Sequence, residues 1–279
     1  MKKVTDAPFL RDFVEATQNI YRLGWAERNG GNISYLIDGN EAAEYLDLGN
    51  VLRTIPVNFD AKGVEGKIFL VTGAGKYFRN VIKDPEANLG ILRVGADGAS
   101  AEVLWGFRDG GRPTSEFSAH ILSHKARLSV DPENRIVMHC HPNYTMAMTY
   151  SHELDEAKFT RTLWSLNTEC IVDFPDGVGV LPWMPCGTPE IGAATAEKLK
   201  EFRIVVWAIH GIYAVGRNMD EAFGLIETVE KTATTYLIGS HLPIVNRIPD
   251  DGLAELCRIY HKENYRKDFL PDLSEKYKG

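Results

Sequence analysis

The stretch RIVMHCH, residues 135–141, joins a short apolar run to two histidines separated by one residue. The apolar run predicts a strand, and a helix is expected to follow it to about Tyr150. Alternate side chains of a strand face the same side of the sheet, so His139 and His141 point one way and Cys140 the other. This strand therefore offers two potential metal ligands from a rigid element.

Outward from this strand, apolar runs bounded by glycine alternate with stretches of helical periodicity. Proline at the first helical position and hydroxyl residues just before a helix mark several helix starts. Helices and strands are mixed through the chain, which predicts an α/β layered protein, expected to be a single domain over residues 1–279. Segment 38–66 is expected to be irregular, a loop with short elements. Strands are predicted at 33–37, 68–72, 101–106 and 203–210, and helices at 8–28, 114–128, 188–202, 220–240 and 252–265.

The composition excludes several classes of protein. The formal net charge is −7 and there is no long basic run, so nucleic acid is not an expected partner. No apolar run is long enough for a signal peptide or a transmembrane helix. The four cysteines show no CxxC spacing and indicate neither a disulfide framework nor a zinc ribbon, so a reducing cytoplasm is expected.

A third histidine completes a possible metal site. His210 is predicted to end the apolar strand 203–210, and Gly211 would let the chain turn close to a metal. Three neutral imidazoles with an open coordination position are a common catalytic zinc site. The alternative is a pair of strand-end histidines bonded to the backbone, with an unrelated third.

A rival ligand set lies on one predicted helix. Glu116, His120 and His124 are spaced i, i+4, i+8 and share a helix face. They lack the HExxH pattern of helical zinc sites, so a packed or solvated helix face is the competing interpretation.

Three turns have the character of anion-binding elements. Glycines in Asn29-Gly30-Gly31-Asn32 and Gly73-Ala74-Gly75-Lys76 allow backbone amides to converge, and Thr114-Ser115 offers hydroxyls at a helix start. Each signal is weak alone, but together beside a metal they fit a phosphate monoester. Glu116 follows this hydroxyl pair and could act as a general base, although a carboxylate there also suits the helix dipole.

The chain resembles the class II sugar-phosphate aldolase family in segments that keep their order from about residue 10 to 240. Within the family, residues 174–184 and the long 38–66 segment favour the branch that cleaves rhamnulose 1-phosphate. The matching segments are GWAERNGGNIS (24–34), VTGAGKYFRN (71–80), DPEANLGI (84–91), PTSEFSAHILSH (113–124), VMHCH (137–141), TECIVDFPDGVGVLPWM (168–184) and IHG (209–211).

The resemblance implies a central, mainly antiparallel sheet flanked by helices, with one Zn²⁺ per subunit. It implies a cytoplasmic homotetramer in which Glu169 reaches the active site of a neighbouring subunit. Ala74 stands where the family often has a hydroxyl residue, so one phosphate hydrogen bond is expected to be missing. The implied zinc ligands are His139, His141 and His210, the implied catalytic carboxylate is Glu116, and the implied phosphate contacts are Asn29, Gly31, Asn32, Gly75, Thr114 and Ser115.

The implied reaction is retro-aldol cleavage to dihydroxyacetone phosphate and L-lactaldehyde. Zinc would stabilise the enediolate as a Lewis acid, and Glu116 would protonate its carbon. The alternatives within the family are another sugar-phosphate aldolase, a ribulose-phosphate-type 4-epimerase and a metal-dependent dehydratase. A non-catalytic cytoskeletal binding module is the alternative from a different class.

Overall fold

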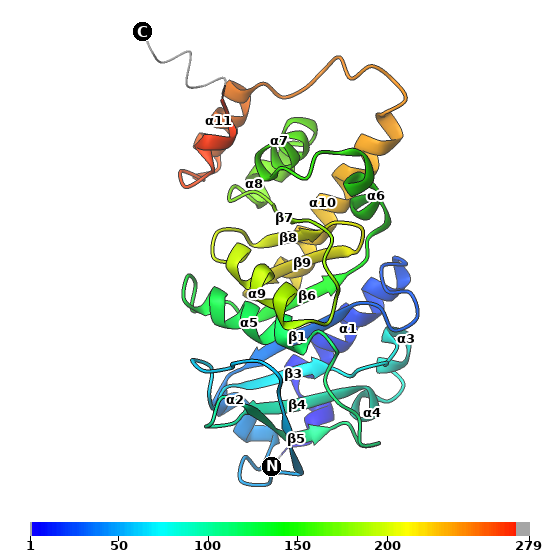
Figure 1. The fold of residues 1–279 in the computed structure, drawn as a ribbon, viewed down its shortest axis with the longest axis vertical. Coiled ribbons are helices and arrows are strands. Elements are labelled where there is room, and N and C mark those ends of the chain that lie inside the picture. The colour runs from blue at the N-terminus through cyan, green and yellow to red at the C-terminus, as the bar shows by residue number, and fades with distance from the viewer. Residues whose placement is uncertain (1, 272–279) are drawn as a thin grey trace.

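The structure, a computed structural model, describes residues 2–271 and is built around a nine-stranded sheet (Figure 1). The strand order is β2-β5-β4-β3-β1-β6-β9-β8-β7, and only the β7–β8 pair is parallel. The expected mainly antiparallel sheet is therefore confirmed. The strands are β1 (Asn32–Ile37), β2 (Arg53–Pro56), β3 (Ile68–Thr72), β4 (Leu89–Val94), β5 (Ser100–Gly106), β6 (Ile136–Cys140), β7 (Gly179–Leu181), β8 (Ile204–Trp207) and β9 (Gly211–Gly216).

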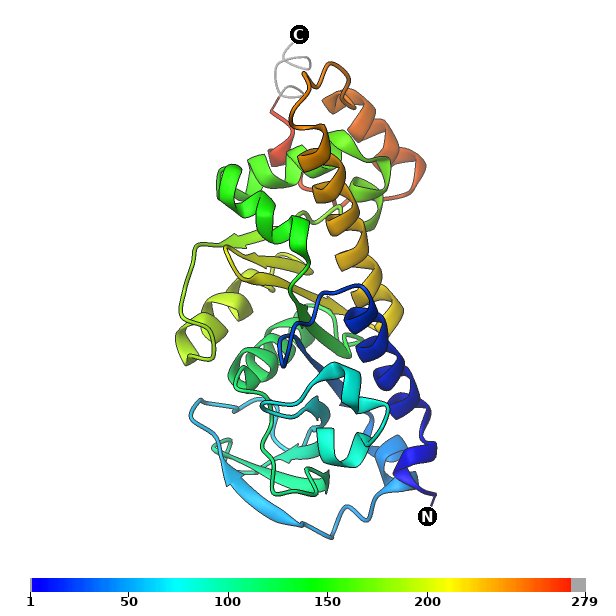
Figure 2. The same ribbon diagram turned by 90° about the vertical axis from the view of Figure 1, so that its right-hand side faces the viewer.

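Helices cover both faces of the sheet, as the side view in Figure 2 shows. On one face lie α1 (Pro8–Arg22) and α10 (Met219–Gly239), and on the other lie α5 (Phe117–Leu128) and α9 (Pro189–Lys198). Nowhere in residues 2–271 is a helix long and apolar enough to cross a bilayer. The other helices are α2 (Gly39–Tyr45), α3 (Phe78–Val81), α4 (Pro85–Asn88), α6 (Asn143–Ser151), α7 (Glu156–Leu166), α8 (Thr168–Asp173) and α11 (Asp250–Ile259), with short 3-10 turns at Val4–Asp6 and Lys267–Phe269.

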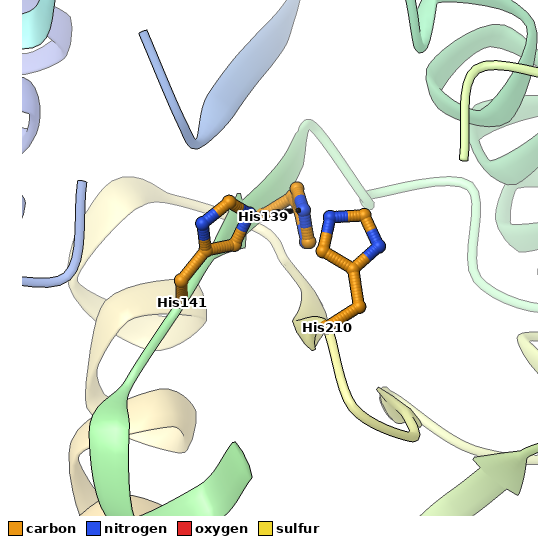
Figure 3. A group of neighbouring side chains, drawn as sticks. All are labelled: His139, His141 and His210. Atoms are coloured by element: carbon orange, nitrogen blue, oxygen red, sulfur yellow. Dashed lines mark hydrogen bonds between the residues drawn. The ribbon is translucent and has the colours of Figure 1, made fainter. Parts of the chain in front are cut away.

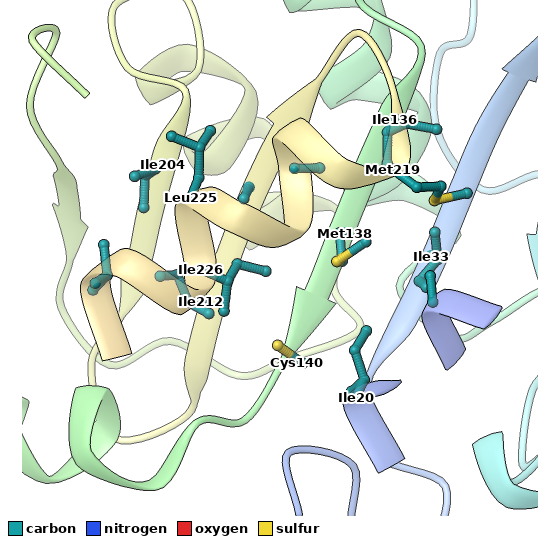
Figure 4. Packing of buried hydrophobic residues seen from close by; sticks show 14 of the residues in the cluster. Ile20, Ile33, Ile136, Met138, Cys140, Ile204, Ile212, Met219, Leu225 and Ile226 are labelled. Atoms are coloured by element: carbon teal, nitrogen blue, oxygen red, sulfur yellow. The ribbon is translucent and has the colours of Figure 1, made fainter. Parts of the chain in front are cut away.

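The central strand β6 has two different faces. Ile136, Met138 and Cys140 point into the larger core beneath α10, where they meet residues such as Ile226 (Figure 4). His139 lies on the opposite face, stacked on Tyr213 at a ring-centroid distance of 4.4 Å. Burial of each large apolar side chain contributes about 1.5–3 kcal/mol, so β6 is firmly held. The predicted division between Cys140 and the histidine face is confirmed.

Two element boundaries differ from the sequence prediction because turns interrupt apolar periodicity. The helix predicted over 8–28 ends at Arg22, and Gly24 follows with φ of +77°. Trp25 looked like one more apolar position of that helix, but it packs on Phe223 of α10 from the loop. The strand predicted over 203–210 is shorter than expected, because β8 ends at Trp207 and residues 208–210 form the turn into β9.

Helix starts and ends show smaller differences. The helix expected from Thr114 begins at Phe117, with Glu116 at the N-cap position. Thr188 caps α9 as expected, since its side chain accepts a hydrogen bond from the amide of Ile191. The helix predicted over 252–265 is α11, which ends at Ile259.

Candidate metal centre and active site

Three histidines from two neighbouring segments point toward one another (Figure 3). His139 is on β6, His141 follows that strand directly, and His210 lies in the turn between β8 and β9. One ligand nitrogen from each lies within 4.8 Å of the others, a spacing suited to a single metal ion. The structure thus brings together the three residues that the sequence had singled out, although His210 is in a turn and not at a strand end.

The ring nitrogens of two histidines are oriented for a metal. His139 Nδ1 lies 2.9 Å from the carbonyl oxygen of Ile212, and His141 Nδ1 lies 2.9 Å from Glu27 Oε1. Both partners only accept hydrogen bonds, so each Nδ1 carries the proton and each Nε2 of a neutral ring is bare. These two Nε2 atoms face each other at 3.2 Å.

Two bare acceptors at that distance can share one bound cation. Nitrogens bound tetrahedrally to zinc at about 2.0–2.1 Å would be about 3.3 Å apart, close to the observed separation. Burial and the neighbouring histidines lower the pKa of His139 well below its usual value, and burial lowers the pKa of His210 to about 4. Neutral imidazoles are the form that binds metal, so this donor set fits a divalent metal ion.

The turn that presents His210 is tight and strained. Ile209 has φ of +62°, which a β-branched residue rarely adopts, and its amide donates to Thr149 Oγ1 at 3.0 Å. A Cβ on Gly211 would lie 2.4 Å from the carbonyl oxygen of Cys140. It would also lie 2.9 Å from the His141 ring and 3.0 Å from the His139 ring. Glycine is therefore required where the hairpin passes the metal centre.

Glu116 lies beside the histidines and is buried. Its Oε2 is 3.6 Å from His139 Nε2, and its Oε1 is 3.9 Å from His210 Nε2. Oε2 also accepts hydrogen bonds from Asn32 Nδ2 at 3.0 Å and from Tyr213 Oη at 2.8 Å. Burial raises the pKa of Glu116, and these two hydrogen bonds oppose that rise. A carboxyl group of this kind is suited to proton transfer.

The helix face of Glu116, His120 and His124 is packed and is not a joint metal site in the described chain. Both histidine rings are buried and hydrogen-bonded to Ser34 Oγ of β1. Burial lowers the pKa of His120 to about 3, and the pKa of His124 lies well below its usual value for the same reason.

The three candidate anion-binding turns converge at one edge of the sheet. β1 begins where its antiparallel neighbour β3 ends, so the turn before Asn32 and the turn after Thr72 lie at the same end. Gly73 pairs with Pro113, which brings Thr114 and Ser115 alongside. Gly31 and Gly75 have φ of +76° and +69°, and a Cβ on Gly31 would lie 3.2 Å from the carbonyl oxygen of His139. Thr114 and Ser115 also line a hollow of about 170 Å³ next to Phe59.

Asn32, which was expected to contact phosphate, has its side chain beside Glu116. Its side-chain amide is already engaged at both ends, with Nδ2 donating to Glu116 and Oδ1 bonded to His120 Nε2. These contacts favour a role in orienting Glu116 over a role in holding phosphate.

Glu169 lies apart from the three histidines within this chain. It is exposed at the start of α8, its amide donates to Asn167 Oδ1, and α8 packs on α7, α10 and α11. Among residues 2–271, no contact joins it to Glu116 or to the histidines.

Three residues near the centre escaped the sequence analysis. Glu27 bonds His141, Tyr213 bonds Glu116, and the exposed Cys186 could form a second ligand group with Glu116 and His210. Glu27 belongs to the GWAERNGG segment, but nothing in its spacing indicates a histidine partner more than one hundred positions away. Tyr213 and Cys186 likewise approach only through the tertiary fold.

The sequence matches the family described as Class II Aldolase and Adducin N-terminal domain over residues 11–237, and the chain belongs to that family. It is 57% identical to the rhamnulose-1-phosphate aldolase of Listeria monocytogenes, over 91% of this chain and 94% of that protein. It is 59% identical to the rhamnulose-1-phosphate aldolase of Enterococcus faecalis, over 84% of each chain. The crystal structure of a sugar-phosphate aldolase from Thermotoga maritima superposes with a TM-score of 0.73 at 28% identity, covering 84% of this chain and 96% of that one.

Proposed function

We propose that this protein is a zinc-dependent aldolase that cleaves L-rhamnulose 1-phosphate to dihydroxyacetone phosphate and L-lactaldehyde. The observation that carries the proposal is the pair of bare Nε2 atoms of His139 and His141, 3.2 Å apart, with His210 and buried Glu116 beside them. The identity to rhamnulose-1-phosphate aldolases supports the choice of sugar. The catalytic unit is one domain over residues 1–279, supported by a core that takes residues from Val4 to Leu270.

His139, His141 and His210 would hold the metal. When bound, zinc supplies a Lewis acid for the oxygens of the fragment that becomes dihydroxyacetone phosphate. In the cleavage direction the C3–C4 bond breaks and its electron pair stays on C3. The C4 hydroxyl loses its proton as it becomes the aldehyde carbonyl, and Glu116 gives a proton to C3. In condensation Glu116 removes that proton.

The phosphate group would lie at the convergent turns. Backbone amides near Gly31 and Gly75, the Asn29 side chain, and the hydroxyls of Thr114 and Ser115 offer donors at one sheet edge. Asn32 contributes indirectly, through Glu116.

The working form would be a cytoplasmic homotetramer. Glu169 is exposed and remote from the histidines of its own chain, which supports a role at a neighbouring subunit's site. There it would accept the C4 hydroxyl proton or bind the aldehyde. Symmetric closed assemblies are the usual state of soluble oligomers.

The test is to incubate the zinc-loaded protein with L-rhamnulose 1-phosphate and measure both products. Dihydroxyacetone phosphate and L-lactaldehyde in equal amounts, with loss of activity on chelation, are the expected result. An epimeric ketose phosphate without triose formation would favour the 4-epimerase, and no turnover by fully metallated protein would favour a binding module.

A further inference from the structure

A continuous chain of buried hydrogen bonds runs from α5 through β1 to Glu116. Ser34 Oγ lies 2.9 Å from His124 Nε2 and 2.7 Å from His120 Nδ1. The other nitrogen of His120, Nε2, is bonded to Asn32 Oδ1, and Asn32 Nδ2 donates to Glu116 Oε2. Asn32, Ser34, His120 and His124 are all buried. The aldolase chemistry proposed above uses none of the three residues Ser34, His120 and His124.

The direction of every hydrogen bond in this chain follows from Glu116. An ionised carboxylate only accepts, so Asn32 must present its Nδ2 to Glu116 and its Oδ1 to His120. His120 Nε2 then carries a proton, and in a neutral ring Nδ1 must accept from the Ser34 hydroxyl. The Ser34 Oγ atom in turn accepts a hydrogen bond from His124 Nε2–H. All donors therefore point toward Glu116.

The chain also makes the two oxygens of Glu116 different. Oε2 accepts from both Asn32 and Tyr213, whereas no hydrogen bond to Oε1 is found within the described chain. Oε1 lies on the side of His210, 3.9 Å from its Nε2. The oxygen free to exchange a proton with a substrate is Oε1.

We propose that Ser34, His120 and His124 form a directional hydrogen-bond chain that positions Glu116, with Oε2 held and Oε1 left to transfer the proton. The proton-transfer part rests on the function proposed above, whereas the bond directions do not. A fully satisfied buried network selects one geometry, and aligned hydrogen bonds polarise one another. Apolar side chains would pack α5 on β1 equally well but would leave the Asn32 amide unoriented.

Neutron crystallography of the wild-type protein tests the bond directions without any variant. Deuterons are expected on His120 Nε2 and His124 Nε2, with His120 Nδ1 bare and the Ser34 deuteron pointing toward it. A deuteron on His120 Nδ1 would overturn the proposal, whatever reaction the protein catalyses.

Deuterium exchange tests the consequence for proton transfer. With dihydroxyacetone phosphate alone in D₂O, exchange at its C3 requires Glu116 but no carbon–carbon cleavage. Ser34→Ala should slow this exchange about three- to tenfold, the effect of one hydrogen bond, with zinc content and affinity for inorganic phosphate unchanged. Ser34→Thr keeps the hydroxyl and should restore most of the rate.

Thr160→Val is the matched control. Thr160 lies on remote α7, and its buried hydroxyl accepts a hydrogen bond from the amide of Val178. This variant should exchange at the wild-type rate. Equal exchange in Ser34→Ala and wild type, or a loss explained entirely by lost zinc, would overturn the positioning role. Absence of exchange in the wild type would count against the aldolase function itself, while the neutron result would still decide the directions.

Discussion

His141 Nδ1 lies 2.9 Å from Glu27 Oε1 and 3.0 Å from Glu27 Oε2. This carboxylate therefore orients the imidazole from the Nδ1 side, opposite the Nε2 atom that faces His139. Glu27 belongs to the turn that leads into Asn29-Gly30-Gly31-Asn32. A Cβ on Gly30 would lie 2.9 Å from the His141 ring. One short segment therefore orients a metal-facing histidine and forms a candidate phosphate-binding turn.

The first prediction follows from this contact. Glu27→Ala should weaken zinc binding about 10–100-fold, because carboxylate partners of metal-binding histidines fix the ring and raise its basicity. Competition with a chromophoric chelator measures the affinity. Glu263→Ala is a matched control, since Glu263 also faces a histidine, His261, but on the exposed surface. Equal affinities in both variants would show that the contact is incidental.

Direct loss of a ligand should have a larger effect. His139→Ala and His210→Ala should each lose bound zinc and nearly all activity while remaining folded, because each variant removes one of the three imidazoles proposed to hold the metal. Elemental analysis after dialysis checks the metal, and circular dichroism checks the fold. His152→Ala, which loses a contact to Thr162 outside the centre, should keep its zinc. Wild-type zinc content in the His139 or His210 variant would refute the ligand assignment.

Glu116→Gln should separate binding from chemistry. The amide keeps the shape but cannot exchange a proton, so turnover should fall about 10²–10⁴-fold. Zinc content and affinity for a phosphorylated substrate analogue should persist, as measured by calorimetry. A rate near wild type would leave Glu116 as a helix N-cap residue without a catalytic role.

Shared active sites can be tested by subunit mixing. Glu169→Ala and Glu116→Ala chains should each be inactive, and mixed oligomers should recover part of the activity. Recovery is expected because some sites would combine an intact Glu116 with an intact Glu169 from the neighbour. Verified mixed oligomers without recovery, or a fully active monomer, would remove Glu169 from the mechanism.

The buried histidines of α5 should make stability pH-dependent. The pKa of His120 is about 3 in the fold but about 6.5 in an unfolded chain, so only the unfolded chain binds this proton between those values. The free energy of unfolding should therefore fall as pH drops below 6.5, by up to about 1.4 kcal/mol per pH unit for each such histidine. Urea unfolding at several pH values between 6 and 5 gives the free energy of unfolding as a function of pH. This free energy should fall less steeply with decreasing pH in His120→Gln than in wild type. Identical slopes would mean that His120 is protonated in the fold.

Local patterns in the sequence were enough to predict the strands nearest the site. β3 coincides with the predicted 68–72, and β1 differs from 33–37 by one residue, because both are buried runs that end at glycine turns. The end of β8 was predicted three residues too late. The run from Ile204 to Gly216 is apolar almost throughout, so nothing marks the turn at 208–210. An isoleucine in the left-handed region is held there by tertiary contacts that no local pattern reveals.

The site itself was predictable in its residue types but not in its supporting contacts. The i, i+4, i+8 spacing correctly placed Glu116, His120 and His124 on one helix face. That face meets Ser34, 86 and 90 positions from the two histidines, so its hydrogen bonds depend on how β1 packs against α5. Long-range pairing of this kind is specified by the whole core.

The pairing of Asn32 with His139 closes a loop of roughly 100 residues, a separation that raises the contact order and slows folding. Glu116 and the candidate phosphate turns precede β6 in the sequence, whereas His139 is on β6 and His141 and His210 come after it. In a nascent chain, Glu116 and the candidate phosphate turns would therefore be present before the three candidate metal ligands are synthesised. Metal could then bind only after β6, β8 and β9 have packed into the sheet. In a refolding experiment, zinc uptake should therefore lag behind the formation of secondary structure.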